Sequence, residues 1–246
     1  MCHTAAAAPR RLGARLYCRA MAGLPELWRE LPPSLARAWD PERPWDLLGE
    51  PLDAALAELP SGRIESAVGP DVHLSGDRIV IEKGVRLAPG AVIEGPAYLG
   101  EGSTVRPGAY LRGGVWLAAG SLVGANTEVK RSILLAGARA PHLAYVGDSV
   151  LGREANLGAG TILSNFRHDG REIVIPHGDE RLATGRRKLG ALLGDGVHTG
   201  CNCVLHPGCV VGAGTSLYPG VHLRAGVYPA GRLIKLRQQL EVVEVT

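Results

Sequence analysis

Aliphatic residues recur every six positions along most of the chain. A first run comprises Ile81, Leu87, Ile93, Leu99, Val105, Leu111, Leu117, Val123, Val129 and Leu135, and a second comprises Leu193, Thr199 (its one polar member), Leu205, Val211, Leu217 and Leu223. Helices repeat every 3.6 residues and strands every two, so neither explains this period. A strict short period predicts a solenoid in which successive coils stack equivalent side chains.

Two further positions of the six-residue repeat support this prediction. When the aliphatic residue is position one, position five is small or β-branched and is expected to point inward: Ala91, Ala97, Ser103, Ala109, Val115, Ser121, Thr127 and Ile133, then Val197, Cys203, Cys209, Thr215, Val221 and Val227. Position four is often glycine, as in Gly108 and Gly120. Glycine adopts positive φ without steric cost, so these residues are expected to form the corners between flat faces.

The repeat resembles that of the hexapeptide-repeat transferases. This resemblance implies an all-β fold, a left-handed parallel β-helix with three repeats in each coil, and assembly into a homotrimer. We place the β-helix at residues 63–230 and a C-terminal tail at 231–246.

The segment before the repeats differs in kind. Helix-like apolar spacing, three of the four tryptophans and a stop at Pro60-Ser61-Gly62 predict a small helical cap or linker over residues 21–62, covering the first coil. Residues 1–20 are expected to be a disordered extension. The chain contains neither a signal-peptide pattern nor a run of 18 apolar residues, so we expect no membrane partner.

Charge and cysteine content exclude other classes. The net charge of +3 is too small and too dispersed to predict a nucleic-acid partner. Five cysteines without a disulfide spacing favour a reducing, cytoplasmic location. Cys201 and Cys203, with His198 and His206, could be drawn as a zinc site. The hexad instead places Cys203 among the small inward residues, so we expect no metal.

The period fails between Leu135 and Leu193. Pro141 takes a position-one slot and is followed by His142, and the period then restarts at Leu151 and stops at Asn165. A polar stretch follows, which we interpret as a loop inserted at residues 166–187. Loops inserted into a solenoid lie on its outside and often carry function.

Here the resemblance becomes specific. The segments 142–148 and 156–165 resemble the acetyltransferase domain of the bifunctional N-acetylglucosamine-1-phosphate uridylyltransferase/glucosamine-1-phosphate N-acetyltransferase. The segments 185–194 and 44–48 are similar to archaeal sugar-1-phosphate nucleotidylyltransferases that share this domain. The resemblance covers roughly residues 43–230.

The family resemblance implies a role for each matched residue. His142 matches the general base. The residues matched to substrate binding are Arg106, Lys130, Tyr145, Asn156, Asn165 and Lys188, and those matched to the coenzyme wall are Ala159, Cys201 and Pro219. Two departures stand out. Arg106 and Lys130 are separated by one more hexad than in the family, and Phe166 stands where bacterial members have tyrosine.

The chemistry supports these roles independently. Acetyl transfer to an amino sugar requires a neutral amine, and an imidazole can accept the amine proton near neutral pH. Backbone N–H groups at the Gly158–Gly160 turn can approach a thioester carbonyl closely and stabilise its developing charge. A phosphate on the sugar requires cations, which Lys130, Lys188 and an arginine can supply.

The sequence therefore predicts an enzyme that transfers acetyl from acetyl-CoA to glucosamine-1-phosphate or galactosamine-1-phosphate. Residues 1–62 do not resemble the nucleotidyltransferase domain of the family, so nucleotide-sugar synthesis is not expected. Two alternatives remain open. One is a stand-alone acyltransferase acting on a nucleotide-linked amino sugar, and the other is a non-catalytic β-helix trimer that binds a sugar nucleotide.

Overall fold

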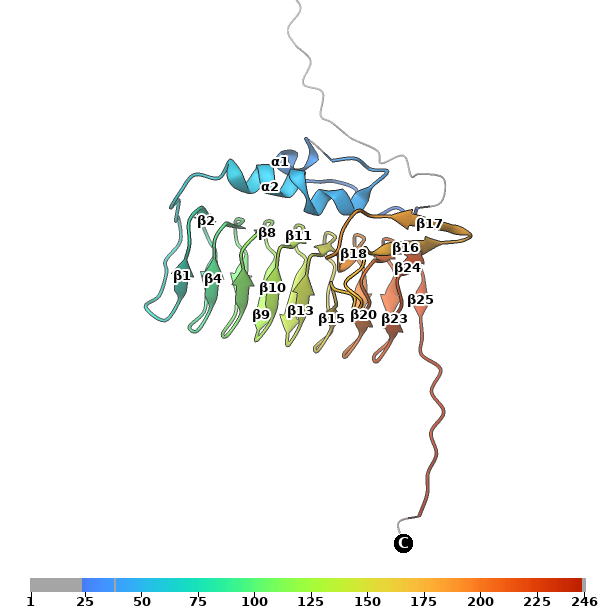
Figure 1. The fold of residues 1–246 in the computed structure, drawn as a ribbon. Coiled ribbons are helices and arrows are strands. Elements are labelled where there is room, and N and C mark those ends of the chain that lie inside the picture. The colour runs from blue at the N-terminus through green and yellow to red at the C-terminus, as the bar shows by residue number, and fades with distance from the viewer. Residues whose placement is uncertain (1–23, 38, 245–246) are drawn as a thin grey trace, which may run out of the picture.

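The repeats form a three-sided parallel β-helix (Figure 1). The structure is a computed structural model that describes residues 24–37 and 39–244. The expected extension at residues 1–20 lies outside the described residues. The predicted fold class, a left-handed parallel β-helix with an N-terminal helical segment, is confirmed.

The coils contribute short strands to three faces, and one coil has only a single bridging residue on face III. Face I contains β1 (His73–Ser75), β4 (Val92–Glu94), β7 (Tyr110–Arg112), β10 (Glu128–Lys130), β13 (Tyr145–Gly147), β15 (Ile162–Leu163), β20 (Val204–Leu205) and β23 (His222–Leu223). Face II contains β2 (Ile79–Ile81), β5 (Ala97–Leu99), β8 (Val115–Leu117), β11 (Ile133–Leu134), β14 (Val150–Leu151), β18 (Ala191–Leu193), β21 (Cys209–Val211) and β24 (Gly226–Tyr228). Face III contains β3 (Arg86–Leu87), β6 (Thr104–Val105), β9 (Leu122–Ala125) and β12 (Arg139–His142), then β19 (His198–Thr199), β22 (Ser216–Leu217) and β25 (Leu233–Ile234), with Asn156 bridging the two groups.

The interior follows the predicted six-residue pattern with four exceptions. Ile133 and Leu135 were expected to point into the β-helix, but both point outward and are buried under the N-terminal segment. Leu134 points into the β-helix instead. Ala140, rather than Pro141, takes the next inward position. Val227 also lies on the outer surface, contrary to the prediction.

These exceptions share one cause, a shortened corner between faces I and II. Leu117 pairs with Leu134, 17 residues later, whereas Leu99 pairs with Leu117 at a full coil of 18. The missing residue falls between Val129 and Leu134, and the next coil is shortened at the same corner. Single left-handed residues, Arg131 at φ 44° and Asp148 at φ 43°, make these tight corners.

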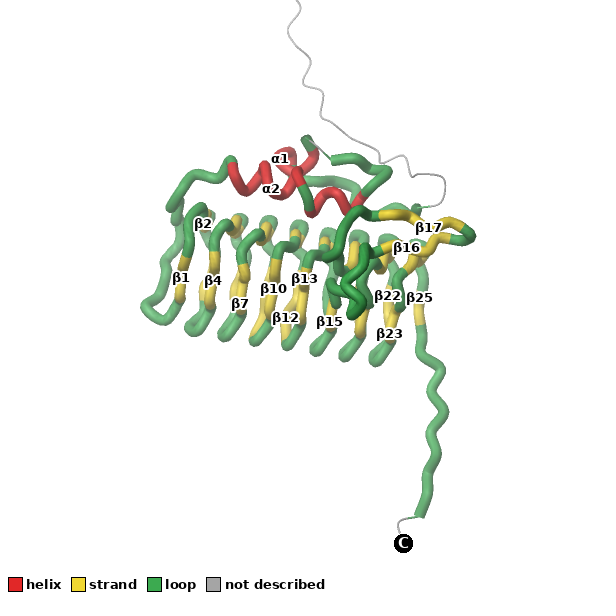
Figure 2. The backbone as a smooth tube through the Cα atoms, in the orientation of Figure 1, coloured by secondary structure: helices red, strands yellow, loops and turns green. Residues whose placement is uncertain are grey.

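The N-terminal segment lies along face II (Figures 1 and 2) and not over the open end of the first coil, so the predicted position was wrong. It contains α1 (Pro33–Ala36), the 3₁₀ helix η1 (Pro44–Leu48) and α2 (Glu50–Ala57). Its buried residues pack on the outward apolar row of face II, which includes Trp116, Ile133, Val150, Leu192 and Val210. Face II is therefore buried on both sides, as parallel sheets generally are.

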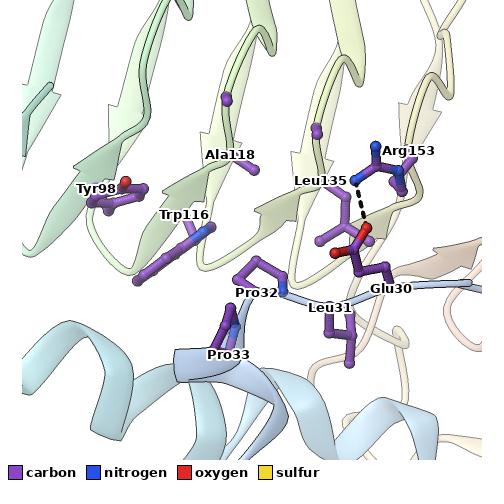
Figure 3. Close-up of a pocket in the computed structure, with 11 residues that line it drawn as sticks. Glu30, Leu31, Pro32, Pro33, Tyr98, Trp116, Ala118, Leu135 and Arg153 are labelled. Atoms are coloured by element: carbon purple, nitrogen blue, oxygen red, sulfur yellow. Dashed lines mark ion pairs between the residues drawn. The ribbon is translucent and has the colours of Figure 1, made fainter. Parts of the chain in front are cut away.

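Figure 3 shows the contact at the start of this segment. Pro32 and Pro33 approach Trp116, whose ring stacks on Tyr98 with centroids 4.2 Å apart. At the rim, Glu30 pairs with Arg153 at 3.5 Å. The indole N–H of Trp28 also donates to the backbone oxygen of Leu193 at 2.8 Å. Aromatic packing and this hydrogen bond thus fix the segment against the coils.

The inserted segment is more ordered than its polarity suggested. It contains a hairpin of β16 (Val174–His177) and β17 (Glu180–Ala183). Ile173 and Ile175 are buried with the N-terminal segment over the later coils of face II. Arg43 donates to the backbone oxygen of Thr184 at 3.2 Å and so ties the hairpin to the N-terminal segment. The insertion thus extends the cover of face II.

Cys201 and Cys203, which the alternative zinc site would bring together, do not face the same side of the coil. Cys203 lies inside the β-helix and its thiol donates to the backbone oxygen of Tyr218 at 3.2 Å, whereas Cys201 is exposed. Within residues 24–37 and 39–244, no group of three or more metal-binding side chains is present. In the same part of the chain, no helix is long and apolar enough to cross a membrane.

We expect Gly124→Ala to destabilise the β-helix strongly. A Cβ at Gly124 would lie 1.6 Å from the backbone oxygen of Pro141 in the next coil, and backbone cannot move aside locally. The expected loss in unfolding free energy is about 3 kcal/mol or more. The control Gly102→Ala has positive φ (67°) but no heavy atom within 4 Å of the new Cβ, and should cost about 1 kcal/mol. Chemical unfolding of both variants checks this order, and equal losses would contradict it.

Candidate functional site

A polar cavity of about 340 Å³ lies where face I meets the inserted segment. Its lining consists of Arg112, Lys130, Tyr145, Asn165, Phe166 and Lys188. Four of the six predicted substrate residues are therefore brought together: Lys130, Tyr145, Asn165 and Lys188. Three successive coils and the returning end of the insertion supply them, although Tyr145 and Lys188 are far apart in sequence.

A buried carboxylate holds two of the residues that line this cavity. Asp148 is only 1% exposed and accepts hydrogen bonds from Lys130 Nζ, at 3.0 Å, and from the side-chain amide of Asn165. Its backbone oxygen accepts a hydrogen bond from Gly190 N–H at 2.8 Å, where the chain returns from the insertion. Asp148 thus fixes two predicted substrate residues, although it was not itself among the predicted site residues.

Tyr145 closes one side of the cavity by lying over Gly147. A Cβ at Gly147 would meet the Tyr145 ring at 2.7 Å and the Asn165 amide nitrogen at 2.6 Å, so only glycine leaves room for both side chains. Burial raises the pKa of Tyr145, and the negative charges of Glu128 and Asp148 raise it further. The phenol therefore remains protonated at neutral pH and can donate a hydrogen bond.

The other wall comes from the two ends of the insertion. Phe166 and Lys188 form an antiparallel bridge, and Leu189 N–H donates to the backbone oxygen of Asn165 at 3.0 Å. Lys188 and Phe166 are both exposed, Phe166 to 44%. The insertion therefore leaves a cation and an aromatic face beside the buried Asp148.

His142 lies at the opposite edge of face I, on the corner shared with face III. It is the exposed last residue of β12, and β13 begins three residues later with Tyr145. Backbone hydrogen bonds stack the equivalent corners of later coils on it: Gly160 N–H donates to His142 O at 3.1 Å, Asn202 to Ala159 O at 2.8 Å, and Gly220 to Cys201 O at 2.9 Å. His142, Ala159, Cys201 and Pro219 thus occupy the same corner in successive coils, and we call this row the His142 column.

Arg106 and Asn156 do not join the cavity. Asn156 pairs with Arg139 and His198 on face III, and Arg106 follows β6 on the same face. Arg112 occupies the position expected for Arg106, because it lies in the same outward row of face I as Lys130, one coil of 18 residues earlier. Its guanidinium pairs with Glu128 at 2.7 Å. The grouping of Arg106 with Lys130 was therefore wrong.

Comparison with known proteins agrees with this architecture. Residues 78–113 match the bacterial transferase hexapeptide family (six repeats). A bifunctional sugar-1-phosphate nucleotidylyltransferase/acetyltransferase of Sulfurisphaera tokodaii is 46% identical over 97 residues, which are 39% of this chain and 24% of that protein. The bifunctional protein GlmU of Methanococcus aeolicus is 35% identical over 173 residues, 70% of this chain and 41% of its own length.

A bacterial relative matches over a similar span. The bifunctional protein GlmU of Methylibium petroleiphilum is 35% identical over 188 residues, 74% of this chain and 36% of that protein. The resemblance inferred from the sequence is confirmed by these matches. The chain aligns with less than half the length of each of these curated relatives.

Proposed function

We propose that this protein is an acetyltransferase that moves acetyl from acetyl-CoA to the amine of an amino-sugar 1-phosphate, either glucosamine-1-phosphate or galactosamine-1-phosphate. The observation that carries the proposal is the cavity on face I that is lined by Lys130, Tyr145, Asn165 and Lys188. The exposed His142 lies at the corner that leads into the same face, three residues before Tyr145. The Sulfurisphaera tokodaii relative, named as a sugar-1-phosphate nucleotidylyltransferase/acetyltransferase, supports it.

In this proposal, the phosphate binds near Lys130 and Arg112 while the sugar amine faces His142. The imidazole accepts a proton from the ammonium, and the free amine attacks the thioester carbonyl. A C–N bond forms and the C–S bond breaks, and the second proton lost by the amine nitrogen is taken up by the departing thiolate, so that an amide and coenzyme A thiol are released. Ala159, Cys201 and Pro219 would line the path of the coenzyme along the His142 column.

Release of coenzyme A thiol from acetyl-CoA tests the proposal. We expect turnover with one of the two amino-sugar 1-phosphates and none with the corresponding N-acetylated sugar, because its nitrogen is already acylated. Absence of thiol release with every amino-sugar phosphate would instead favour a non-catalytic scaffold that binds sugar nucleotides.

We also propose that the active form is a homotrimer, and Leu143 provides a test. This residue follows His142, is 60% exposed and adopts a left-handed φ of 51°, which is costly for leucine and tolerable for asparagine. Leu143→Asn should therefore preserve the melting temperature but weaken trimer association about tenfold or more by removing an apolar contact between protomers. Analytical ultracentrifugation at micromolar concentration measures both proteins, and a wild-type monomer would refute the assembly.

A further inference from the structure

A second cavity continues from the candidate site along the corner between faces I and II. Its volume is about 400 Å³, and it shares Arg112 and Lys130 with the first cavity. Its floor is the turn at Gly113 and Gly114, and its outer wall is α2, which contributes Asp53, Leu56 and Ala57. Each cavity alone has the size of a small-ligand site, so an amino-sugar monophosphate in the first would leave the second unfilled.

The second cavity is strongly cationic. Arg78, Arg112, Lys130 and Arg131 line it, against the single carboxylate of Asp53. Arg131 pairs with Asp53 at 2.8 Å and also donates to the backbone oxygen of Leu48. Arg112 and Lys130 pair with carboxylates outside this lining, Glu128 and Asp148. Within the described residues, Arg78 makes neither an ion pair nor a side-chain hydrogen bond, so its guanidinium is available to an anion.

The backbone turns at this corner determine how open the second cavity is. Arg78 and Arg131 have φ values of 53° and 44°, in the left-handed region that favours glycine and asparagine. Left-handed residues also occur at other corners, such as Asn126 and Asn202, so this conformation belongs to the corner turns of the fold and glycine would adopt it without strain. The adjoining Gly113 and Gly114 also have positive φ and carry no side chain that would obstruct an anion between the two arginines.

We propose that the second cavity binds a further phosphoryl group of the acceptor, so that the preferred acceptor is an amino sugar carrying a diphosphate, as in a nucleoside diphosphate sugar. This inference rests on the proposed acetyl transfer and names its substrate class. Arg112 and Lys130, shared by both cavities, contact the phosphoryl group next to the sugar. Arg78 and Arg131 contact the next one through charge-assisted hydrogen bonds.

Kinetics with two acceptors tests the proposal. We expect kcat/KM for uridine diphosphate glucosamine to exceed that for glucosamine-1-phosphate at least tenfold. Arg78→Gly removes the guanidinium and relieves the backbone strain, so the variant should fold normally. It should lower kcat/KM for the diphosphate acceptor about tenfold and affect the monophosphate much less. The control Arg86→Ala removes an exposed arginine from face III and should alter neither acceptor.

Titration calorimetry with pyrophosphate and uridine diphosphate separates this inference from the proposed activity. Arg78-dependent binding of both ligands supports a diphosphate subsite, and binding of uridine diphosphate alone supports one that also requires the nucleoside. If glucosamine-1-phosphate is acetylated at least as well and Arg78→Gly changes neither acceptor, the inference fails and the acetyltransferase proposal stands. If neither acceptor is acetylated, the acetyltransferase proposal fails. In that case, the diphosphate subsite also fails if pyrophosphate and uridine diphosphate do not bind, or if they bind equally well to Arg78→Gly.

Discussion

His142→Ala should lower kcat for acetyl transfer by about 10² or more while leaving the fold intact. General base catalysis contributes about 10²–10⁴ in rate, and the proposed reaction needs a neutral amine at the moment of attack. His142 is exposed at a corner, so truncation creates no cavity and strands no buried partner. Its backbone oxygen, which accepts a hydrogen bond from Gly160, is retained in the variant.

Two measurements distinguish loss of a base from general damage to the site. The affinity for the sugar phosphate should change little, because Lys130, Asn165 and Lys188 lie at the other edge of face I. The rate of the variant should rise with pH more steeply than that of the wild type, since solvent alone must deprotonate the amine. The control His222→Ala alters an exposed histidine in a later coil of face I and should leave the rate unchanged. An unchanged rate in His142→Ala would remove His142 from the mechanism.

The six-residue period predicted the β-helix because every coil must bury the same inward positions. It failed where Ile133, Leu134 and Leu135 follow one another, since any of the three satisfies an aliphatic position. A deletion of one residue at the preceding corner is therefore invisible to the pattern. The position of the N-terminal segment could have been predicted from the sequence. The outward residues of face II, such as Trp116, Ile133 and Val150, are apolar and therefore must be covered by another part of the chain.

The site was predicted best where neighbouring residues in the sequence stay together in space. Tyr145 and Asn165 were identified from continuous segments, and both line the cavity. Arg106 was misplaced because the motif was matched at Arg106 despite the extra hexad, and Arg112, which lies 18 residues before Lys130, was not considered. A full coil has 18 residues, so the residue beside Lys130 in the same row of face I is Arg112 of the preceding coil. Asp148 was missed because its importance comes from burial, which no motif displays.

Asp148→Ala should reduce both stability and acceptor binding, because one carboxylate fixes two cavity residues. Removing it leaves the Lys130 ammonium, whose side chain is only 21% exposed, without its partner, and also leaves the Asn165 amide unpaired. Breaking a buried pair from one side costs about 3 kcal/mol or more. The KM for the sugar phosphate should rise about tenfold or more as both side chains lose their positions, and kcat should fall less because His142 lies elsewhere.

Asp148→Asn separates charge from shape. Asparagine keeps the side-chain volume and tolerates the φ of 43°, so the tight corner should survive. The amide can still accept one hydrogen bond but cannot balance the charge of Lys130, so we expect a smaller loss of stability with a KM still raised severalfold. Asp169→Ala, which removes an exposed carboxylate paired with Arg167 on the insertion, is the control and should leave KM unchanged. If thermal unfolding and KM of both Asp148 variants match the wild type, Asp148 does not organise the site, and Lys130 and Asn165 must be positioned by the bound substrate itself.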